Sequence, residues 1–201
     1  KDQVDPDVTE MSKALGFVPV SWQTSGRLRA TKEDQDHVEA IKSNALITSE
    51  LRQQVAIQSL IFENCDLSLA NINKVVLREV QFKECKMVGL KFDTTDSFSI
   101  SIAIDHCILT YASFYKLKLK NTIFLHSKLN EVDFTEADLT NAVFDHCDLT
   151  NSIFSGTNLE KADFATALNY SIDMDANKIK KSKHSKGQLG GLLEKYNLTI
   201  E

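Results

Sequence analysis

Apolar side chains recur at every fifth position through most of the chain. Six phenylalanines follow one another at every tenth position, and six leucines lie halfway between them. These residues are Phe114, Phe124, Phe134, Phe144, Phe154 and Phe164, with Leu109, Leu119, Leu129, Leu139, Leu149 and Leu159. A period of five walks around an α-helix and alternates between the two faces of a flat strand, so neither element would keep these side chains together. The pattern therefore predicts a closed coil of five-residue sides, with the apolar residues pointing inward.

Rarer residues indicate how many sides each coil has. Cys65 and Cys85 are separated by four of these five-residue units, and the same interval separates His106 from His126 and His126 from His146. Four sides bring the chain back over itself after four units. The sequence therefore predicts a four-sided solenoid.

The five-residue period changes phase once. Inward positions run from Ile47 to Phe92 in the first phase and from Ile104 to Phe164 in the second, and the two phases differ by two residues. The polar stretch at 93–99 lies at this change and is typical of a small loop, so we expect the coil there to be longer than the others by two residues. With this correction the inward residues form continuous columns, of which one contains Phe62, Phe82, Ile104, Phe124, Phe144 and Phe164.

The repeating unit carries a short motif. Ala137-Asp138-Leu139-Thr140-Asn141 and Cys147-Asp148-Leu149-Thr150-Asn151 have the form A(D/N)LXX or a close variant. They resemble the repeats of the pentapeptide repeat protein family. The resemblance implies an all-β fold, a right-handed quadrilateral parallel β-helix, with the repeats at 45–166 and short helical caps.

The two ends of the chain lack the repeat, and a β-helix needs its exposed strand edges covered. We interpret residues 1–44 as a non-repeat arm or helical cap, and residues 167–201 as a C-terminal capping and dimerisation module. An apolar stripe at helical spacing lies in the second segment and consists of Leu189, Leu192, Leu193 and Tyr196. The segment resembles the C-terminal module of quinolone-resistance pentapeptide repeat proteins, which implies a tail-to-tail homodimer through these residues.

Composition and motifs exclude several function classes. The net charge of −5 and pI near 5.6 argue against direct binding of nucleic acid, and no apolar run is long enough to span a membrane. No nucleophile elbow, phosphate-binding loop or H-E-x-x-H motif is present in the sequence. We therefore expect a cytoplasmic protein that is not an enzyme and takes no cofactor.

Cysteines and histidines are the candidate metal ligands. The cysteines, Cys65, Cys85, Cys107 and Cys147, occupy one inward column and lack CxxC spacing, which favours buried free thiols over a metal cluster. His106, His126 and His146 stack at an outward corner beside Asp105 and Asp145. Three rungs are too far apart for all three histidines to share one zinc ion, although two could. We interpret them as a solvated ladder without metal, and a metal or pH-sensing site is the alternative.

Two surfaces are candidates for partner binding. Outward apolar residues at Ile61, Ala103, Ile123 and Val143 form a strip that is either a contact surface or a tolerated variation of the repeat. Residues 129–175 contain ten acidic side chains and one basic one. Eight of the acidic residues surround the last coils: Glu131, Asp133, Glu136, Asp138, Asp145, Asp148, Glu160 and Asp163.

Two functions fit these features. The resemblance to quinolone-resistance proteins implies a DNA mimic that binds DNA gyrase or another topoisomerase and protects it against quinolones. The acidic residues would then imitate the phosphates of a DNA duplex. The alternative is a scaffold or protein–protein interaction module with an unrelated partner, because a fold does not fix a function.

Overall fold

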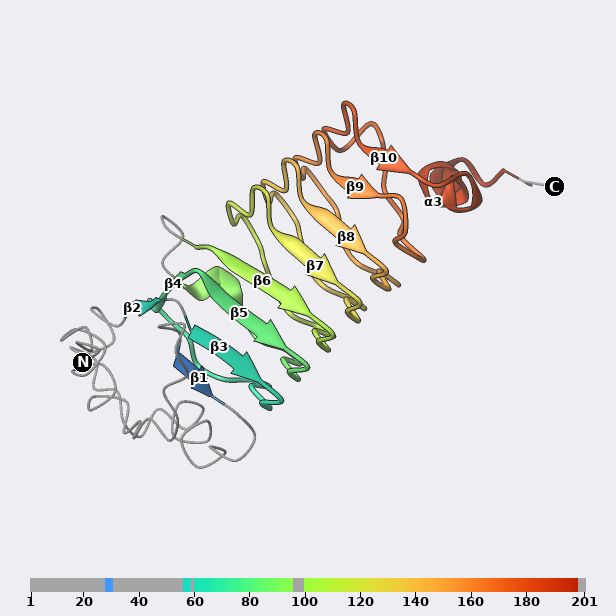
Figure 1. Cartoon of the computed structure of the whole chain (residues 1–201). Helices are drawn as coiled ribbons and strands as arrows, with labels where there is room; N and C mark the ends of the chain where they lie inside the picture. Colours follow the sequence, from blue (N-terminus) through green and yellow to red (C-terminus); the bar gives the residue numbers. More distant parts are fainter. Residues whose placement is uncertain (1–27, 31–55, 59, 96–99, 199–201) are drawn as a thin grey trace.

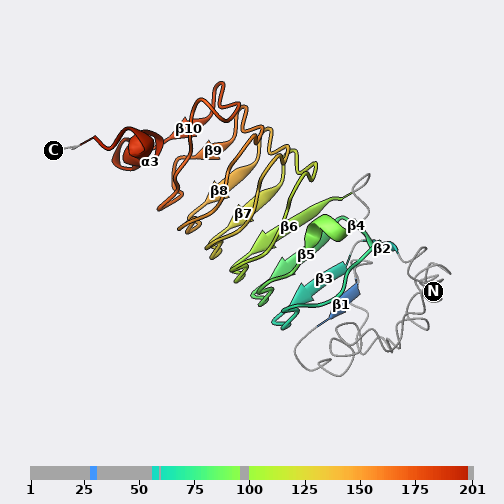
Figure 2. The same ribbon diagram turned by 180° about the vertical axis from the view of Figure 1, so that it is seen from behind.

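The described residues fold into a rod of stacked coils (Figure 1). This computed structural model describes residues 28–30, 56–58, 60–95 and 100–198. One side of the rod is a parallel sheet of eight short strands, seen from behind in Figure 2. In order, they are β1 (Leu28–Ala30), β3 (Leu60–Glu63), β5 (Val80–Lys83), β6 (Ile102–Asp105), β7 (Ile123–Leu125), β8 (Val143–Asp145), β9 (Asp163–Phe164) and β10 (Lys183–His184). A second, two-stranded sheet pairs β2 (Ala56–Gln58) with β4 (Val76–Arg78).

The strand register confirms the four-sided β-helix predicted from the sequence. Phe62 pairs with Phe82, and Ile104 pairs with Phe124, so each coil returns after four five-residue units. Between them, Phe82 pairs with Ile104, so that this one coil is longer by the expected two residues. The predicted loop at 93–99 begins within a short 3-10 helix, η3 (Phe92–Thr94), and its residues 96–99 lie outside the described part of the chain.

The corners of the coils explain why a five-residue side closes. Ten successive corner residues, one in each side, have φ between 47° and 62°: His106, Tyr111, Lys116, Asn121, His126, Glu131, Glu136, Asn141, His146 and Asn151. This left-handed conformation costs about 1 kcal/mol for a residue with a side chain. Hydrogen bonds between coils offset that cost, since the corner N–H of Lys116 donates to the carbonyl of Thr135 at 3.0 Å and that of Glu136 to Ser155 at 2.8 Å.

Stacked phenyl rings fill the core. Phe114, Phe134 and Phe154 lie in one stack, with 5.3 and 5.2 Å between ring centroids. A second stack includes Phe124 and Phe144 at 4.9 Å. The two stacks meet edge to face, as at 6.0 Å between Phe124 and Phe134. Each buried ring contributes roughly 2–3 kcal/mol through removal of its apolar surface from water, so these columns dominate the stability of the rod.

The four cysteines are buried, as the sequence predicted, and their thiols are free. Ser127 takes the vacant place in their column, where its hydroxyl accepts a hydrogen bond from the N–H of Cys107 at 3.0 Å. Burial raises the pKa of the Cys147 thiol to about 12, which leaves it protonated and unreactive at neutral pH.

The N-terminal end of the rod carries a strand that the repeat pattern does not predict. β1 pairs in parallel with β3, from Leu28 opposite Leu60 to Ala30 opposite Phe62. It therefore covers the edge of β3, the first strand of the repeats in this sheet. The rest of the segment 1–44, which we interpreted as a non-repeat arm or helical cap, lies outside the described residues.

The C-terminal end keeps the coil geometry after the sequence pattern stops. β10 pairs with β9 one coil earlier, and the ring of His184 stacks on Phe164 with 5.4 Å between centroids. The chain then forms η4 (Lys186–Gln188), α3 (Gly190–Leu193) and η5 (Glu194–Tyr196), a helical end close to that expected. None of the helices in the described part of the chain is long and apolar enough to cross a membrane.

Candidate interaction surfaces

The eight acidic residues predicted as a partner-binding surface surround the rod and do not form one row. We call them the acidic collar: Glu131, Asp133, Glu136, Asp138, Asp145, Asp148, Glu160 and Asp163. On one side of the rod, Asp138 has Lys118 and Asn158 as its neighbours in the adjacent coils. On another side, Asp163 lies beside Lys183. Basic and neutral residues therefore separate the carboxylates along each face.

Four collar aspartates, Asp163 with its hydrogen bond from the N–H of Ala165 among them, also hold the corners in place. The carboxylate of Asp133 accepts a hydrogen bond from the N–H of Thr135 at 2.8 Å. Asp148 accepts from both the N–H of Thr150, at 3.2 Å, and its hydroxyl, at 2.6 Å. Asp138 makes the same pair of contacts with Thr140. An aspartate side chain that bonds two residues ahead stabilises a turn, so these residues serve the fold as well as the surface.

Hydrogen bonds lower the pKa of two collar aspartates, Asp148 and Asp163. Burial would raise the pKa of Asp148, but hydrogen bonds from Thr150, Asn169 and Asn130 outweigh it and lower the pKa to about 2. The pKa of Asp163 is also lowered, chiefly by the hydrogen bond from Lys183. These two carboxylates are therefore ionised at neutral pH.

Neighbouring lysines neutralise part of this charge. Lys120 lies 3.3 Å from Asp138, and Lys183 lies 2.9 Å from Asp163, each measured between ammonium nitrogen and carboxylate oxygen. At the corner, Glu136 pairs with Lys116 at 3.4 Å while its side chain remains 52% exposed. Exposed pairs of this kind attract weakly, so the glutamates can still contact a partner.

The predicted apolar strip lies on the flat side of the rod. Ala103, Ile123 and Val143 are direct neighbours in β6, β7 and β8, and Ile123 is 44% exposed. Ile61 is almost fully buried, and Gln81 separates it from the other three. The strip therefore has three members instead of the four expected. We call Ala103, Ile123 and Val143 the β-face stripe.

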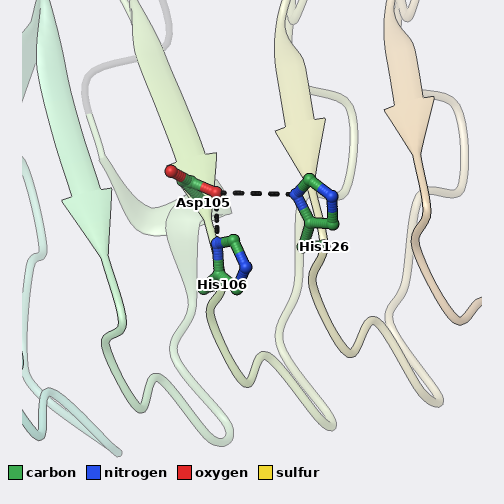
Figure 3. A group of neighbouring side chains, drawn as sticks. All are labelled: Asp105, His106 and His126. Atoms are coloured by element: carbon green, nitrogen blue, oxygen red, sulfur yellow. Dashed lines mark hydrogen bonds and ion pairs between the residues drawn. The ribbon is translucent and has the colours of Figure 1, made fainter.

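The histidine ladder borders the β-face stripe at the next corner. The rings of His106 and His126 stack with 4.6 Å between centroids, and those of His126 and His146 with 5.2 Å. Nδ1 of His106 lies 2.7 Å from Oδ1 of Asp105, as Figure 3 shows, and Nδ1 of His146 lies 2.8 Å from Oδ1 of Asp145. The stacking predicted from the regular spacing of the histidines is thus present.

The residues predicted to form a dimer interface divide into two groups. Leu192 packs into the protein's own core and is 8% exposed. Leu189 and Tyr196 are 43% and 49% exposed, and Leu193 is half-buried. Leu198, 58% exposed, adds to this apolar end, although the sequence stripe did not include it.

A polar network near the same end escaped the sequence analysis. Nδ1 of His184 lies 3.0 Å from the hydroxyl of Tyr170, and Nε2 of His184 lies 2.9 Å from that of Ser182. Burial lowers the pKa of His184. His184 follows Phe164 by one coil in the sequence. This interval is the one signal from which its place in the phenylalanine column could have been predicted.

Comparison with known proteins supports the repeat assignment. Residues 103–171 match the family model described as pentapeptide repeat region. No curated protein matches the chain significantly.

Several solved structures are similar to this chain. One is QnrB1, a plasmid-mediated fluoroquinolone resistance protein, with 18% identity, a TM-score of 0.36, and coverage of 73% of this chain and 90% of QnrB1. Another is HetL, a pentapeptide repeat protein involved in heterocyst differentiation regulation in the cyanobacterium Nostoc, with 14% identity, a TM-score of 0.31, and coverage of 65% and 86%. A third, from the thylakoid lumen of Arabidopsis thaliana, has 21% identity, a TM-score of 0.25, and coverage of 60% and 67%. The family match and the strand register together confirm the resemblance seen in the sequence, and residues 103–171 are a pentapeptide repeat region.

Proposed function

We propose that the chain is a non-enzymatic binding protein whose acidic collar contacts a basic protein surface, with DNA gyrase or another topoisomerase as its target. The observation that carries this proposal is the charge of the last coils, where residues 129–175 hold ten acidic side chains and one basic one. An enzyme that binds DNA offers a positively charged groove for the phosphates. A rod with a negative collar is complementary to such a groove.

The placement of the collar defines the kind of contact. Because its carboxylates lie on different sides of the rod, a partner that surrounds the rod would meet more of them than a flat partner would. Lysines and asparagines interrupt each face, so the mimicry proposed here consists of dense negative charge and not of a copied row of phosphates. Such an attraction weakens as salt is added.

The repeat motif and the C-terminal segment suggest the particular target. Both resemble those of quinolone-resistance pentapeptide repeat proteins, and a topoisomerase partner agrees with the cytoplasmic location expected from the sequence. Protection of gyrase against quinolones is the corresponding biological role.

The exposed apolar end is the proposed contact with a second copy of the chain. Leu189, Leu193 and Tyr196 are available there, whereas Leu192 already packs in its own core. A tail-to-tail homodimer would place one acidic collar on either side of its dyad. This arrangement doubles the length of negatively charged rod offered to a partner.

Supercoiling by purified gyrase tests the proposal. The full chain should inhibit the reaction, and the inhibition should weaken as salt is raised. The variant Glu131→Gln, Glu136→Gln, Glu160→Gln removes three charges whose side chains make no turn hydrogen bonds among the described residues. At about 0.5 kcal/mol for each exposed charge, the concentration for half-inhibition should rise roughly tenfold.

A matched variant removes positive charge outside the collar. Lys118→Gln with Lys128→Gln changes two exposed residues on earlier coils and should leave inhibition equal or stronger. Equal inhibition by the wild type and the collar variant would contradict the charge argument. No inhibition by the wild type would remove gyrase as the target.

The β-face stripe favours a second candidate function, a scaffold for an unrelated protein. Ile123, which is 44% exposed, lies beside the half-buried Val143 on the parallel sheet, and neighbouring apolar residues at a surface can mark a contact site. Under this function, Ile123→Lys would abolish capture of the partner and the collar variant would not. Under the gyrase function the two variants would have the opposite effects.

A further inference from the structure

Three ligating side chains converge where β6 leaves the sheet. Oδ1 of Asp105 lies 2.7 Å from Nδ1 of His106 and 3.9 Å from Nδ1 of His126, as the dashed lines in Figure 3 mark. One ligand atom from each residue lies within 4.8 Å of the other two. Two residues follow one another in the chain and the third comes from the next coil, so the solenoid itself brings them together.

We propose that Asp105, His106 and His126 bind a divalent transition-metal ion such as zinc. Two imidazole nitrogens and one carboxylate oxygen are ligands that Zn²⁺ accepts in sites with an open position. The fourth position would hold water, or a side chain of a partner that contacts the neighbouring β-face stripe. The site borders the acidic collar, because His126 lies beside Asp145, but none of its three ligands belongs to the collar.

The geometry requires only side-chain movement. With Zn–N bonds of about 2.0–2.1 Å, two ligand nitrogens on one tetrahedral ion lie roughly 3.4 Å apart. The rings of His106 and His126 are stacked nearly parallel, at 16°, so each ring must turn toward the other to share an ion. The histidine side chains are 57% and 44% exposed and have room to turn, while the backbone ladder fixes the rungs.

A similar set formed by His126, Asp145 and His146 is less suited to the ion. The carboxylate of Asp145 already accepts a hydrogen bond from the hydroxyl of Thr166 at 2.7 Å, besides its contact with His146 at 2.8 Å. Within the described residues, the carboxylate of Asp105 makes hydrogen bonds and ion pairs with the two histidines of its own set. Its oxygen is therefore the easier one to redirect toward a metal.

Zinc titration of the tag-free full chain by calorimetry tests the site, with Co²⁺ as a spectroscopic probe of tetrahedral coordination. The variants are His106→Asn, His126→Asn and, as the matched control, His146→Asn. Asparagine suits the left-handed corner that all three histidines occupy, so the substitutions remove the imidazole with little strain. The wild type should bind one ion per chain and show the visible spectrum of tetrahedral cobalt.

The variants locate the ion. Affinity should fall at least about tenfold in His106→Asn and His126→Asn, and remain within about twofold of the wild type in His146→Asn. Zinc should raise the melting temperature of the wild type and of His146→Asn. It should not raise that of His106→Asn or His126→Asn. No zinc binding by the wild type, binding unchanged in His106→Asn, or loss of binding in His146→Asn would each overturn the proposed site.

Discussion

Phe134 and Glu136 are two residues apart in the same coil, yet their surroundings differ completely. The ring of Phe134 is fully buried between Phe114 and Phe154, while the side chain of Glu136 is 52% exposed at a left-handed corner. In the described coils between residues 62 and 164, the central inward position of each side holds phenylalanine, leucine, isoleucine or methionine. The corners accept histidine, tyrosine, lysine, asparagine, glutamate, leucine and glycine. Inward positions therefore specify the fold, and corners are free to carry charge, ligands and contacts.

The largest effect is expected from a charge placed in the core. Phe134→Asp would remove a stacked ring and bury an unpaired carboxylate, and the loss of the ring alone costs about 3–5 kcal/mol. The variant should not fold. Circular dichroism during urea denaturation measures whether the variant has folded structure to lose.

An outward apolar residue of the next coil is the control. Ile153 is 51% exposed, and Ile153→Ser should change the free energy of unfolding by less than about 0.5 kcal/mol. Comparable losses of stability in the two variants would show that the assignment of inward and outward positions is wrong.

Adding a methyl group at Gly191, near the C-terminal end of the rod, should have the next largest effect on stability. A Cβ on Gly191 would lie 1.9 Å from the carbonyl oxygen of Tyr170, so Gly191→Ala must displace α3 from the end of the rod. We expect a loss of about 1–3 kcal/mol in thermal unfolding, and loss of the proposed dimer in sedimentation. Gly187→Ala is the matched control, since a Cβ there meets no atom within 4 Å. Equal melting temperatures for the two variants would contradict this packing.

The turn aspartates make stability depend on pH. Asp148 has a pKa of about 2 in the folded protein, below its usual value of 3.8, so its stabilising contribution is complete above about pH 4 and is lost as the pH falls toward 2. Asp148→Asn keeps an acceptor for Thr150 but lacks the charge. Its free energy of unfolding should be lower than the wild type's by about 1–2 kcal/mol at pH 6, with the difference gone near pH 2. A difference that does not change with pH would refute the role of the charge.

Corner substitutions should have the smallest effect. Lys161 has φ of 59°, and Lys161→Gly should raise the free energy of unfolding by about 1 kcal/mol or less because glycine adopts this conformation without strain. Gly156, at φ of 65°, is the reverse case, and Gly156→Lys should lower the free energy of unfolding by a similar amount. Changes of the same sign in both variants would show that backbone strain at the corners does not contribute.

The fold could be predicted from the sequence because a five-residue period leaves one simple geometry. The one longer coil was visible in the phase of the apolar residues, and the pairing of Phe82 with Ile104 confirms it. β1 could not be predicted. It pairs with β3, from Leu28 opposite Leu60, at an interval that is no multiple of the repeat, and it belongs to no repeat.

The candidate surfaces were predicted less completely. Counting charges along the chain located the acidic collar around the last coils. It did not show that basic and neutral residues separate the carboxylates along each face, because neighbours on a face are a whole coil apart in the sequence. The hydrogen bonds of Asp133 and Asp148 to the threonines two residues ahead depend on corner geometry. Burial of Leu192 and exposure of Leu189 depend on how α3 docks, which helical spacing alone does not determine.

Direct binding to gyrase, measured with and without competing duplex DNA, tests the central claim that the corners and collar of this rod act as a charged contact surface. Purified gyrase should capture the full chain, duplex DNA should displace it, and both effects should weaken as salt is raised. Binding that DNA does not displace, or no binding at low salt, would contradict this claim.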